Sequence, residues 1–165
     1  MTSRVGLGFD VHPFDERRPL VLGGVTIEGA PGLAGFSDAD AVAHAVADAL
    51  LGSVGLPDLG ILFPAGDERY RDASSIELLR EVAERVVAVG WWIVNVDVVV
   101  AAERPPLAPH LEAMVARLTE ALTPARRPLG EGVHVSVKPK RGEGLGAVGR
   151  GEGVAVWAVA LLERG

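Results

Sequence analysis

The sequence predicts an α/β protein of the α+β kind, in which a mixed β-sheet is covered by about three helices. Two observations support this prediction. Strand-like and helix-like segments alternate along the chain, and no low-complexity linker or internal repeat interrupts them. The chain has 165 residues, of which 48% are hydrophobic, so it can bury a sizeable core within one domain. We therefore expect a single domain over residues 1–165.

A strand and a hairpin open the predicted sheet. Residues 4–9 end in Gly and Phe and have the character of a strand. Residues 20–22 and 25–27 lie on either side of Gly23 and Gly24. A Gly-Gly pair between two such runs favours a tight turn, so we expect these runs to form a hairpin.

Capping residues and apolar periodicity predict three helices. Ser37 can cap the first helix, over 38–51, with Asp40 at its third helical position in a pattern that resembles a capping box. Apolar residues at helical spacing predict a second helix over 74–89 and a third over 107–122. A glycine follows the second helix and a proline follows the third, as is typical of helix ends.

The remaining strands are predicted between and after these helices. Residues 93–103 are rich in valine and long enough for a central strand. Residues 134–137 and 154–162 form the last two predicted strands, and the glycine-dense segment 142–153 separates them. Together with the helices, these strands predict a sheet with helices packed on it.

The composition excludes several classes of protein. Sixteen basic residues against 22 acidic residues give a net charge of −6, which argues against a nucleic-acid partner. The chain has no cysteine, so disulfides and thiolate zinc sites are excluded. No signal peptide follows Met1, and the apolar stretches, interrupted at Asn95 and Asp97, are too short to span a bilayer. We expect a cytoplasmic protein without a membrane partner.

A polar stripe marks the first predicted helix. The helix reads DADAVAHAVADALL and is apolar around most of its circumference, which is typical of a buried helix. Asp40, His44 and Asp48 stand four residues apart and therefore share one face. Burying two carboxylates and an imidazole is costly unless each has a partner, a metal or a polar ligand. This face is therefore expected to contact such a group.

Two explanations of His44 are open at this point. A lone histidine on such a helix more often hydrogen-bonds inside the core, with the two carboxylates at a wet edge. The other explanation is a metal site, and Asp10 and His12 favour it. Side chains alternate along an extended segment, so these two residues lie on the same side of the chain. One carboxylate and two histidines are a usual set for catalytic zinc, with the fourth position open.

Two glycine-rich loops near the C-terminus carry charge. Residues 138–144 place three cations and Glu143 beside glycines, whose backbone amides can approach phosphate oxygens. The carboxylate suits a second, hard cation. A basic, glycine-rich turn is only a weak signal by itself. Residues 149–153, taken alone, predict a tight turn with a surface pair of Arg150 and Glu152.

A set of motifs extends over the whole chain in a fixed order. The motifs are Gly8-Phe9-Asp10-Val11-His12, Ser37-Asp38-Ala39-Asp40 with His44, Asp48-Ala49-Leu50-Leu51-Gly52, Asp58-Leu59-Gly60, Leu62-Phe63-Pro64, Asn95-Val96-Asp97, Gly149-Arg150-Gly151-Glu152-Gly153 and Ala158-Val159-Ala160-Leu161-Leu162. In this order and spacing the chain resembles the 2-C-methyl-D-erythritol 2,4-cyclodiphosphate synthases from end to end. Such a collinear set is far more specific than any single motif. We expect the form without a fused cytidylyltransferase.

The resemblance implies a phosphorus-oxygen lyase of the non-mevalonate isoprenoid pathway. It would convert 4-diphosphocytidyl-2-C-methyl-D-erythritol 2-phosphate into 2-C-methyl-D-erythritol 2,4-cyclodiphosphate and release CMP. In that family the 2-phosphate attacks the β-phosphorus without a covalent enzyme intermediate, so catalysis depends on placement and charge stabilisation. The family forms homotrimers with active sites shared between neighbouring subunits, and the resemblance implies the same assembly here.

The resemblance also implies two metal ions and a phosphate contact. Asp10, His12 and His44 match the zinc ligands, and zinc would polarise the β-phosphate as a Lewis acid. Glu143 matches the carboxylate that supports magnesium on the substrate diphosphate. Ser37 and the backbone around it would hold the terminal phosphate at the start of the first helix, where free amides favour an anion.

Further positions match the family's contacts with its cytidine diphosphate substrate. The residues expected at the substrate are Asp10, His12, Ser37, Asp58, Leu59, Gly60, Phe63, Asp67, Ala102, Ala108, Pro139, Lys140, Glu143 and Arg150. Segments 102–108 and 139–141 match the pocket for cytosine and the cytidine phosphate, and 63–67 match a mobile loop. Arg150 matches a residue that lines a cavity on the threefold axis.

Several positions depart from the family pattern. Phe36 stands where a His is usual and Arg141 where a Thr is usual, and both are sites of transition-state stabilisers, so these two residues are the catalytic candidates. A guanidinium donates several hydrogen bonds to phosphate, whereas the Phe36 side chain donates none. The chain also has Pro106 for a usual Lys, Ala65 for an acidic residue and Ala147 for the Phe of the axial cavity.

Three hypotheses follow from these residues. The first is an active synthase with a variant phosphate clamp, since the zinc ligands and Glu143 are intact. The second is a metal-binding paralogue of the same fold with a different phosphorylated ligand or a regulatory role, which Phe36 and Arg141 leave open. The third is a structural trimer with a non-catalytic metal, and the buried polar stripe argues against it because without a ligand it would only be a cost.

Overall fold

One mixed β-sheet and a layer of helices form the fold. The computed structural model describes residues 1–125 and 132–164. Within these residues the strands are β1 (Thr2–Leu22), β2 (Val25–Leu33), β3 (Trp92–Ala101), β4 (His134–Lys140) and β5 (Gly153–Arg164). Their order across the sheet is β2-β1-β5-β3-β4. β3 and β4 run parallel and the other neighbours run antiparallel, so the predicted mixed sheet is confirmed.

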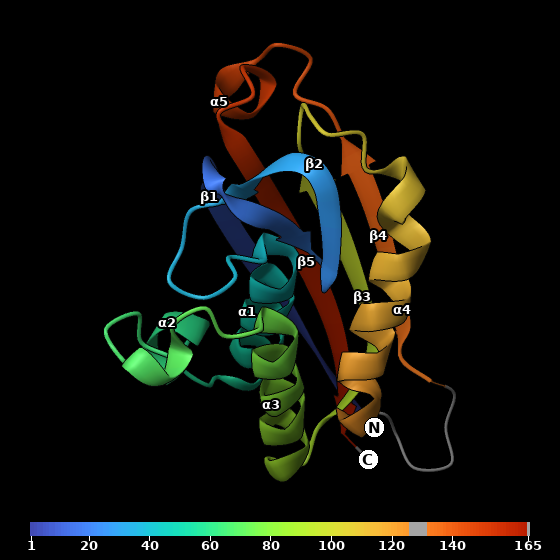
Figure 1. The fold of residues 1–165 in the computed structure, drawn as a ribbon. Coiled ribbons are helices and arrows are strands. Elements are labelled where there is room, and N and C mark those ends of the chain that lie inside the picture. The colour runs from blue at the N-terminus through green and yellow to red at the C-terminus, as the bar shows by residue number, and fades with distance from the viewer. Residues whose placement is uncertain (126–131, 165) are drawn as a thin grey trace.

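The long helices gather on one face of this sheet (Figure 1). The helices are α1 (Ala41–Val54), α2 (Leu59–Leu62), α3 (Ser75–Ala88), α4 (Leu111–Leu122) and α5 (Gly146–Gly149), with 3-10 turns η1 (Glu68–Tyr70), η2 (Ala108–His110) and η3 (Thr123–Ala125). α1 packs on β1 and β5, α3 packs beside α1, and α4 lies over β4. These three helices confirm the predicted covering of the sheet. No helix in the described residues is long and apolar enough to cross a membrane.

β1 is longer than the sequence predicts. Its 21 residues join the predicted strands 4–9 and 20–22 into one element. Residues 2–13 pair with β5, and residues from 14 onward pair with β2. Register shifts on both sides of Pro19 accompany the second pairing. Such irregularities bend a strand, and β1 can therefore serve two neighbours along its length.

The turn between β1 and β2 is tied to the start of α1. Gly23 and Gly24 have φ angles of 57° and 73°, which favour glycine and confirm the predicted Gly-Gly hairpin. Their amides donate to the fully buried carboxylate of Asp40 over 2.8 and 2.6 Å. That carboxylate also accepts two amides from the first turn of α1. Asp40, and not the predicted Ser37, is therefore the N-cap, since either residue type suits that position.

The predicted boundaries are right for one of the other two long helices and wrong for the other. The second prediction, over 74–89, matches α3 within one residue at each end. The third, from 107, is too long, because η2 occupies the first turn and α4 begins at Leu111. Pro109 lies in η2. Proline has no amide hydrogen and disfavours helical geometry in the residue before it, which explains the later start.

β1 and α1 approach each other closely through two glycines. A Cβ atom on Gly6 would lie 1.8 Å from the carbonyl oxygen of Ala49, and one on Gly8 would lie 1.9 Å from that of Ala45. Both contacts are with backbone, which cannot move aside without displacing the helix. This close approach brings the middle of β1 next to His44, and it thereby builds the functional site described below.

We expect Gly8→Ala to lower the free energy of unfolding by about 2 kcal/mol, as overpacking of a filled core does. The matched control is Gly52→Ala, because Gly52 lies inside α1 with nothing within 4 Å of an added Cβ. Alanine is the better helix former by about 1 kcal/mol, so this control is expected to gain stability. Urea unfolding of both variants measures the difference. Equal stability of Gly8→Ala and the parent chain would contradict the packing.

The face of the sheet opposite the helices exposes apolar side chains. The exposed residues of this β1–β5 face are Val5, Leu7, Phe9, Val11, Trp157 and Val159. The strand register places Leu7 opposite Val159 and Phe9 opposite Trp157, and the rings of the last two lie 5.2 Å apart. A contiguous apolar patch of this kind is typical of an interaction surface.

Candidate functional site

The three predicted metal ligands converge where β1 meets α1. Asp10 and His12 lie on β1, and His44 lies on α1. Oδ2 of Asp10 is 2.9 Å from Nε2 of His12 and 3.0 Å from Nδ1 of His44. One atom of each residue lies within 4.8 Å of the others, so the predicted convergence is confirmed. One carboxylate oxygen and two imidazole nitrogens fit a zinc ion with an open fourth position.

Burial and hydrogen bonding set the charge of this cluster. Between 13% and 24% of each side chain is exposed. Burial raises the pKa of Asp10, but the hydrogen bonds of His12 and His44 outweigh it and hold that pKa well below its usual range. Burial lowers the pKa of His12, and the hydrogen bond to Asp10 outweighs this and raises it. Asp10 is therefore ionised, as a carboxylate ligand of a divalent cation must be.

A pocket of about 320 Å³ opens beside the cluster. Besides the three ligands, it is lined by the predicted site residues Phe36, Ser37, Leu59, Gly60 and Phe63. Asp48, Ala65, Tyr70 and Leu78 complete the lining. The size lies within the range of small-molecule sites. β1, α1, α2 and the loop before α1 therefore bring together residues that are far apart in the sequence.

The polar residues on one face of α1 contact two different parts of the structure, the pocket and the hairpin. His44 and Asp48 line the pocket, whereas Asp40 turns to the hairpin. Asp48 accepts the amide of Leu59 over 2.8 Å and so holds the start of α2 at the pocket. Burial raises the pKa of Asp48, against the effect of this amide. Asp58 caps α2 with its side chain and does not line the pocket.

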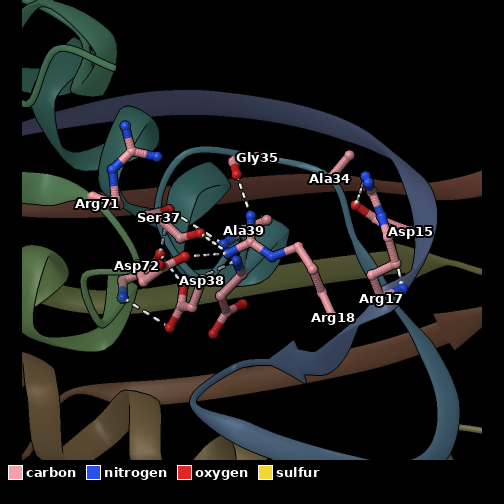
Figure 2. Close-up of polar contacts among 12 residues, drawn as sticks. Asp15, Arg17, Arg18, Ala34, Gly35, Ser37, Asp38, Ala39, Arg71 and Asp72 are labelled. Atoms are coloured by element: carbon pink, nitrogen blue, oxygen red, sulfur yellow. Dashed lines mark hydrogen bonds and ion pairs between the residues drawn. The ribbon is translucent and has the colours of Figure 1, made fainter. Parts of the chain in front are cut away.

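Arg18 holds the loop that carries Phe36 and Ser37. Figure 2 shows its guanidinium directed at the backbone of this loop, where it donates to the carbonyls of Gly35 and Ser37. The same guanidinium lies 3.1 Å from the carboxylate of Asp72. Three acceptors thus converge on one arginine. Arg18 therefore ties β1 to the loop at the pocket and fixes the backbone on both sides of Phe36.

Phe36 lies beneath a cation. The guanidinium carbon of Arg71 is 4.8 Å from the centroid of the Phe36 ring, and Arg71 pairs with Glu68 over 2.7 Å. A cation over an aromatic face is attracted by the ring quadrupole. The Phe36 side chain has no hydrogen-bond donor, but a donor lies directly over its ring.

The first amides of α1 are already bonded. Val42 and Ala43 donate to Asp40 over 3.0 and 3.1 Å, and the amide of Ala39 donates to the Ser37 hydroxyl over 3.2 Å. The resemblance implied that free amides at the start of this helix favour a phosphate. Asp40 and Ser37 accept these amides, so a phosphate contact here would depend on the hydroxyl of Ser37.

A second pocket, of about 290 Å³, lies at the ends of β3 and β4. Its lining contains the predicted residues Ala102, Ala108, Pro139, Lys140 and Arg141, together with Glu103, Pro105, Pro106 and Leu107. The parallel register sets Ala101 beside Lys140, which explains why segments 102–108 and 139–141 meet. The structure therefore joins the two segments that match the cytidine pocket. This second pocket shares no lining residue with the pocket beside Asp10, His12 and His44, which we call the metal pocket.

Glu103 organises one wall of this second pocket. Its carboxylate pairs with Arg141 and accepts the amides of Gly142 and Glu143 over 3.0 and 3.1 Å. The hydrogen bond from Arg141 holds the pKa of Glu103 below its usual range. Arg141 therefore faces the second pocket, and it does not line the metal pocket.

Besides Asp58, three predicted substrate residues line neither pocket. Glu143 follows Arg141 with a φ of 52°, and Asp67 caps η1. Arg150 pairs with Glu152 over 2.6 Å, as the turn predicted over 149–153 implied. The described residues of a single chain thus leave these three side chains outside both pockets.

Sequence reasoning missed several residues at the metal site. Tyr70 and Leu78 line the pocket, and Ser75 bonds to His44 from behind it. All three belong to the segment from η1 to α3, for which the sequence predicts only the helix over 74–89. Ser75 lies at the start of α3, and a serine at this position is typical of a helix start, but nothing in its spacing along the sequence predicts a contact with His44.

Comparisons with known proteins agree with this geometry. The model of the YgbB family matches residues 3–163. The 2-C-methyl-D-erythritol 2,4-cyclodiphosphate synthase of Rubrobacter xylanophilus is 56% identical over 164 residues, which cover 98% of this chain and 95% of that protein. The bifunctional enzyme IspD/IspF of Anaeromyxobacter sp. is 54% identical over 162 residues, and there the chain spans 97% of its own length but 40% of the relative.

Solved structures give the same result. The chain superimposes on the bifunctional IspDF of Campylobacter jejuni with a TM-score of 0.89 and 37% identity, covering 99% of this chain and 43% of that one. A CDP-bound 2C-methyl-D-erythritol-2,4-cyclodiphosphate synthase gives a TM-score of 0.84 at 36% identity, covering 97% of this chain and 100% of that one. The chain therefore belongs to the YgbB family, the family of 2-C-methyl-D-erythritol 2,4-cyclodiphosphate synthases.

Proposed function

We propose that this chain converts 4-diphosphocytidyl-2-C-methyl-D-erythritol 2-phosphate into 2-C-methyl-D-erythritol 2,4-cyclodiphosphate and releases CMP. The observation that carries the proposal is the cluster of Asp10, His12 and His44 at the mouth of a ligand-sized pocket. A relative of nearly the same length, at 56% identity, is a synthase of this product. A structural neighbour at 36% identity binds CDP, which supports a cytidine nucleotide as the ligand.

The proposed reaction is a displacement at phosphorus. An oxygen of the 2-phosphate forms a bond to the β-phosphorus, and the bond from this phosphorus to the oxygen shared with the α-phosphate breaks. CMP leaves with that oxygen, so no water and no oxidant is consumed. Zinc held by Asp10, His12 and His44 would supply Lewis-acid polarisation of the β-phosphate. Ser37 lines the pocket beside these residues, and its hydroxyl can donate to a phosphate oxygen.

The second pocket fits the cytidine part of the substrate. Lys140 and Arg141 bring two cations to its wall, and a guanidinium binds phosphate through several donors. Glu103 holds Arg141 in place. We propose that Arg141 contacts the phosphate of the leaving CMP and that Glu143, next in this loop, supports magnesium on the substrate diphosphate.

We also propose a homotrimer in which neighbouring copies share each active site. Two observations support it. The metal pocket and the second pocket have no lining residue in common within one chain, although one substrate has to engage both. The β1–β5 face exposes 67% of Leu7 and 42% of Trp157, and burial of such a face favours association.

The first test of the function is CMP release from the proposed substrate with zinc and magnesium present, repeated after chelation. We expect chelator-sensitive CMP release with formation of the cyclic diphosphate. A folded, zinc-loaded protein without turnover would support the metal-binding paralogue instead, with Phe36 and Arg141 as the substitutions to reverse.

We expect the parent chain to sediment at about three times the mass of one chain and Leu7→Glu to sediment as smaller species, because a buried charge without a partner opposes association. The matched control is Val89→Glu, since Val89 is also exposed, at 43%, but lies at the end of α3 outside the β1–β5 face. Analytical ultracentrifugation distinguishes the species. A trimeric Leu7→Glu would place the interface elsewhere.

A further inference from the structure

A buried hydroxyl joins His44 to a carboxylate behind the pocket. Ser75 is the first residue of α3 and is 1% exposed. Its Oγ lies 2.8 Å from Nε2 of His44 and donates to Oδ1 of Asp38. The amide of Ser75 donates to the other oxygen of Asp38 over 3.1 Å. Neither Ser75 nor Asp38 lines the metal pocket. Ser75 contacts two residues that do line it, His44 over 2.8 Å and Ser37 over 3.2 Å.

The direction of these hydrogen bonds follows from the acceptors. An ionised carboxylate only accepts, so the single hydroxyl proton of Ser75 is directed at Asp38. The Ser75 oxygen must then accept from His44, and this requires a proton on Nε2. A metal-bound imidazole is neutral and carries one proton, so Nδ1 is the atom left for a metal ion, which would take the place of the proton that Nδ1 shares with Asp10. Nδ1 is the atom that lies 3.0 Å from Asp10, on the metal side.

His12 has a corresponding partner. Its Nδ1 lies 2.6 Å from the carbonyl oxygen of Ala34, which only accepts. The proton on Nδ1 leaves Nε2, 2.9 Å from Asp10, as the atom for a metal ion. In the metal-bound state both imidazoles would thus direct a lone pair at the same space, although they use different ring atoms.

We propose that Ser75 and Asp38 are positioning residues of the metal centre, which select Nδ1 of His44 as its metal-binding atom. Partners behind a metal-bound histidine fix its tautomer and orientation and raise its basicity. Ser37 is a poorer candidate for this role. Its Oγ is 3.2 Å from His44, and it lines the pocket, where a substrate would compete for it.

The role of Ser75 predicts a loss of metal affinity in Ser75→Ala. This inference rests on the metal site of the proposed function, so its test measures binding rather than turnover. We expect zinc affinity, measured by competition with a chelator, to fall about 10- to 100-fold. Ser75→Thr keeps the hydroxyl and is expected to retain most of the affinity.

The matched control is Ser53→Ala. Ser53 is also buried, at 6% exposure, and its hydroxyl donates to the carbonyl of Leu50 over 2.6 Å within α1. We expect this variant to bind zinc like the parent chain. A folded Ser75→Ala with the affinity of the parent chain would overturn the proposal.

A second measurement does not depend on any variant. Nitrogen-correlated NMR of the imidazoles in the zinc-loaded parent chain is expected to show the His44 proton on Nε2, protected from exchange with water. A proton on Nδ1 of His44 would overturn the proposal even if Ser75→Ala fails to fold. These results are independent of CMP release, so a failure of the proposed reaction remains distinguishable from a failure of this inference.

Discussion

Under the proposed function, replacing His44 with alanine is expected to abolish zinc binding and to lower CMP release by roughly three orders of magnitude, because a metal Lewis acid supplies several kcal/mol of charge stabilisation. The variant removes one of the three ligand atoms that lie within 4.8 Å of one another. Two ligands rarely retain zinc against a chelator. Zinc content by elemental analysis and the rate of CMP release measure the two effects.

The fold is expected to survive this change. His44 lines an open pocket and its side chain is 13% exposed, so its removal enlarges the pocket and leaves the apolar face of α1 packed on the sheet. His110→Ala is the control, since His110 lies in η2 outside the metal cluster, and it should keep both zinc and activity. Stoichiometric zinc in a folded His44→Ala would contradict the assignment of the metal site.

Replacing Asp40 with alanine is expected to lower the free energy of unfolding by about 4 kcal/mol while leaving the metal ligands in place. Asp40 is fully buried and accepts the amides of Gly23, Gly24, Val42 and Ala43. Each buried donor left without a partner costs about 1 to 3 kcal/mol. Burial, and then the charge of Asp38, raise the pKa of Asp40 to about 6, because burying the ionised carboxylate is unfavourable. Alanine removes this unfavourable contribution, which offsets part of the loss of stability.

Urea unfolding measures this loss, and Glu77→Ala is its control. Glu77 is the acidic residue in the first turn of α3, its side chain is 65% exposed, and it pairs with Arg80 at 3.4 Å. Exposed pairs of this kind contribute about 1 kcal/mol or less. A loss in Asp40→Ala as small as in the control would show that the hairpin does not depend on this cap.

The convergence of the three candidate metal ligands could be predicted because their signals are local. The period of two along β1 places Asp10 and His12 together, and the helical period places His44 on one face of α1. The close approach of the two elements requires glycines 6 and 8, which a strand pattern alone does not explain. Periodicity therefore predicted which residues share a face, and packing decided that the two faces meet.

The contacts behind the site could not be predicted in the same way. Ser75 reaches His44 across 31 positions of sequence, and Glu103 reaches Arg141 across 38. Neither pair has a periodicity that relates its members. Ser37 and Asp40 both suit a helix cap, and only the hairpin amides of Gly23 and Gly24 select Asp40.

The pairing of β1 with β5 determines when the site can form during folding. Asp10 pairs with Val156 and His12 pairs with Val154, so the strand that bears two of the proposed metal ligands pairs with β5, the described strand furthest from it in the sequence. Such distant pairings form slowly. We therefore expect the proposed metal ligands to be synthesised before β5 can hold their strand in place, and metal binding to follow completion of the sheet.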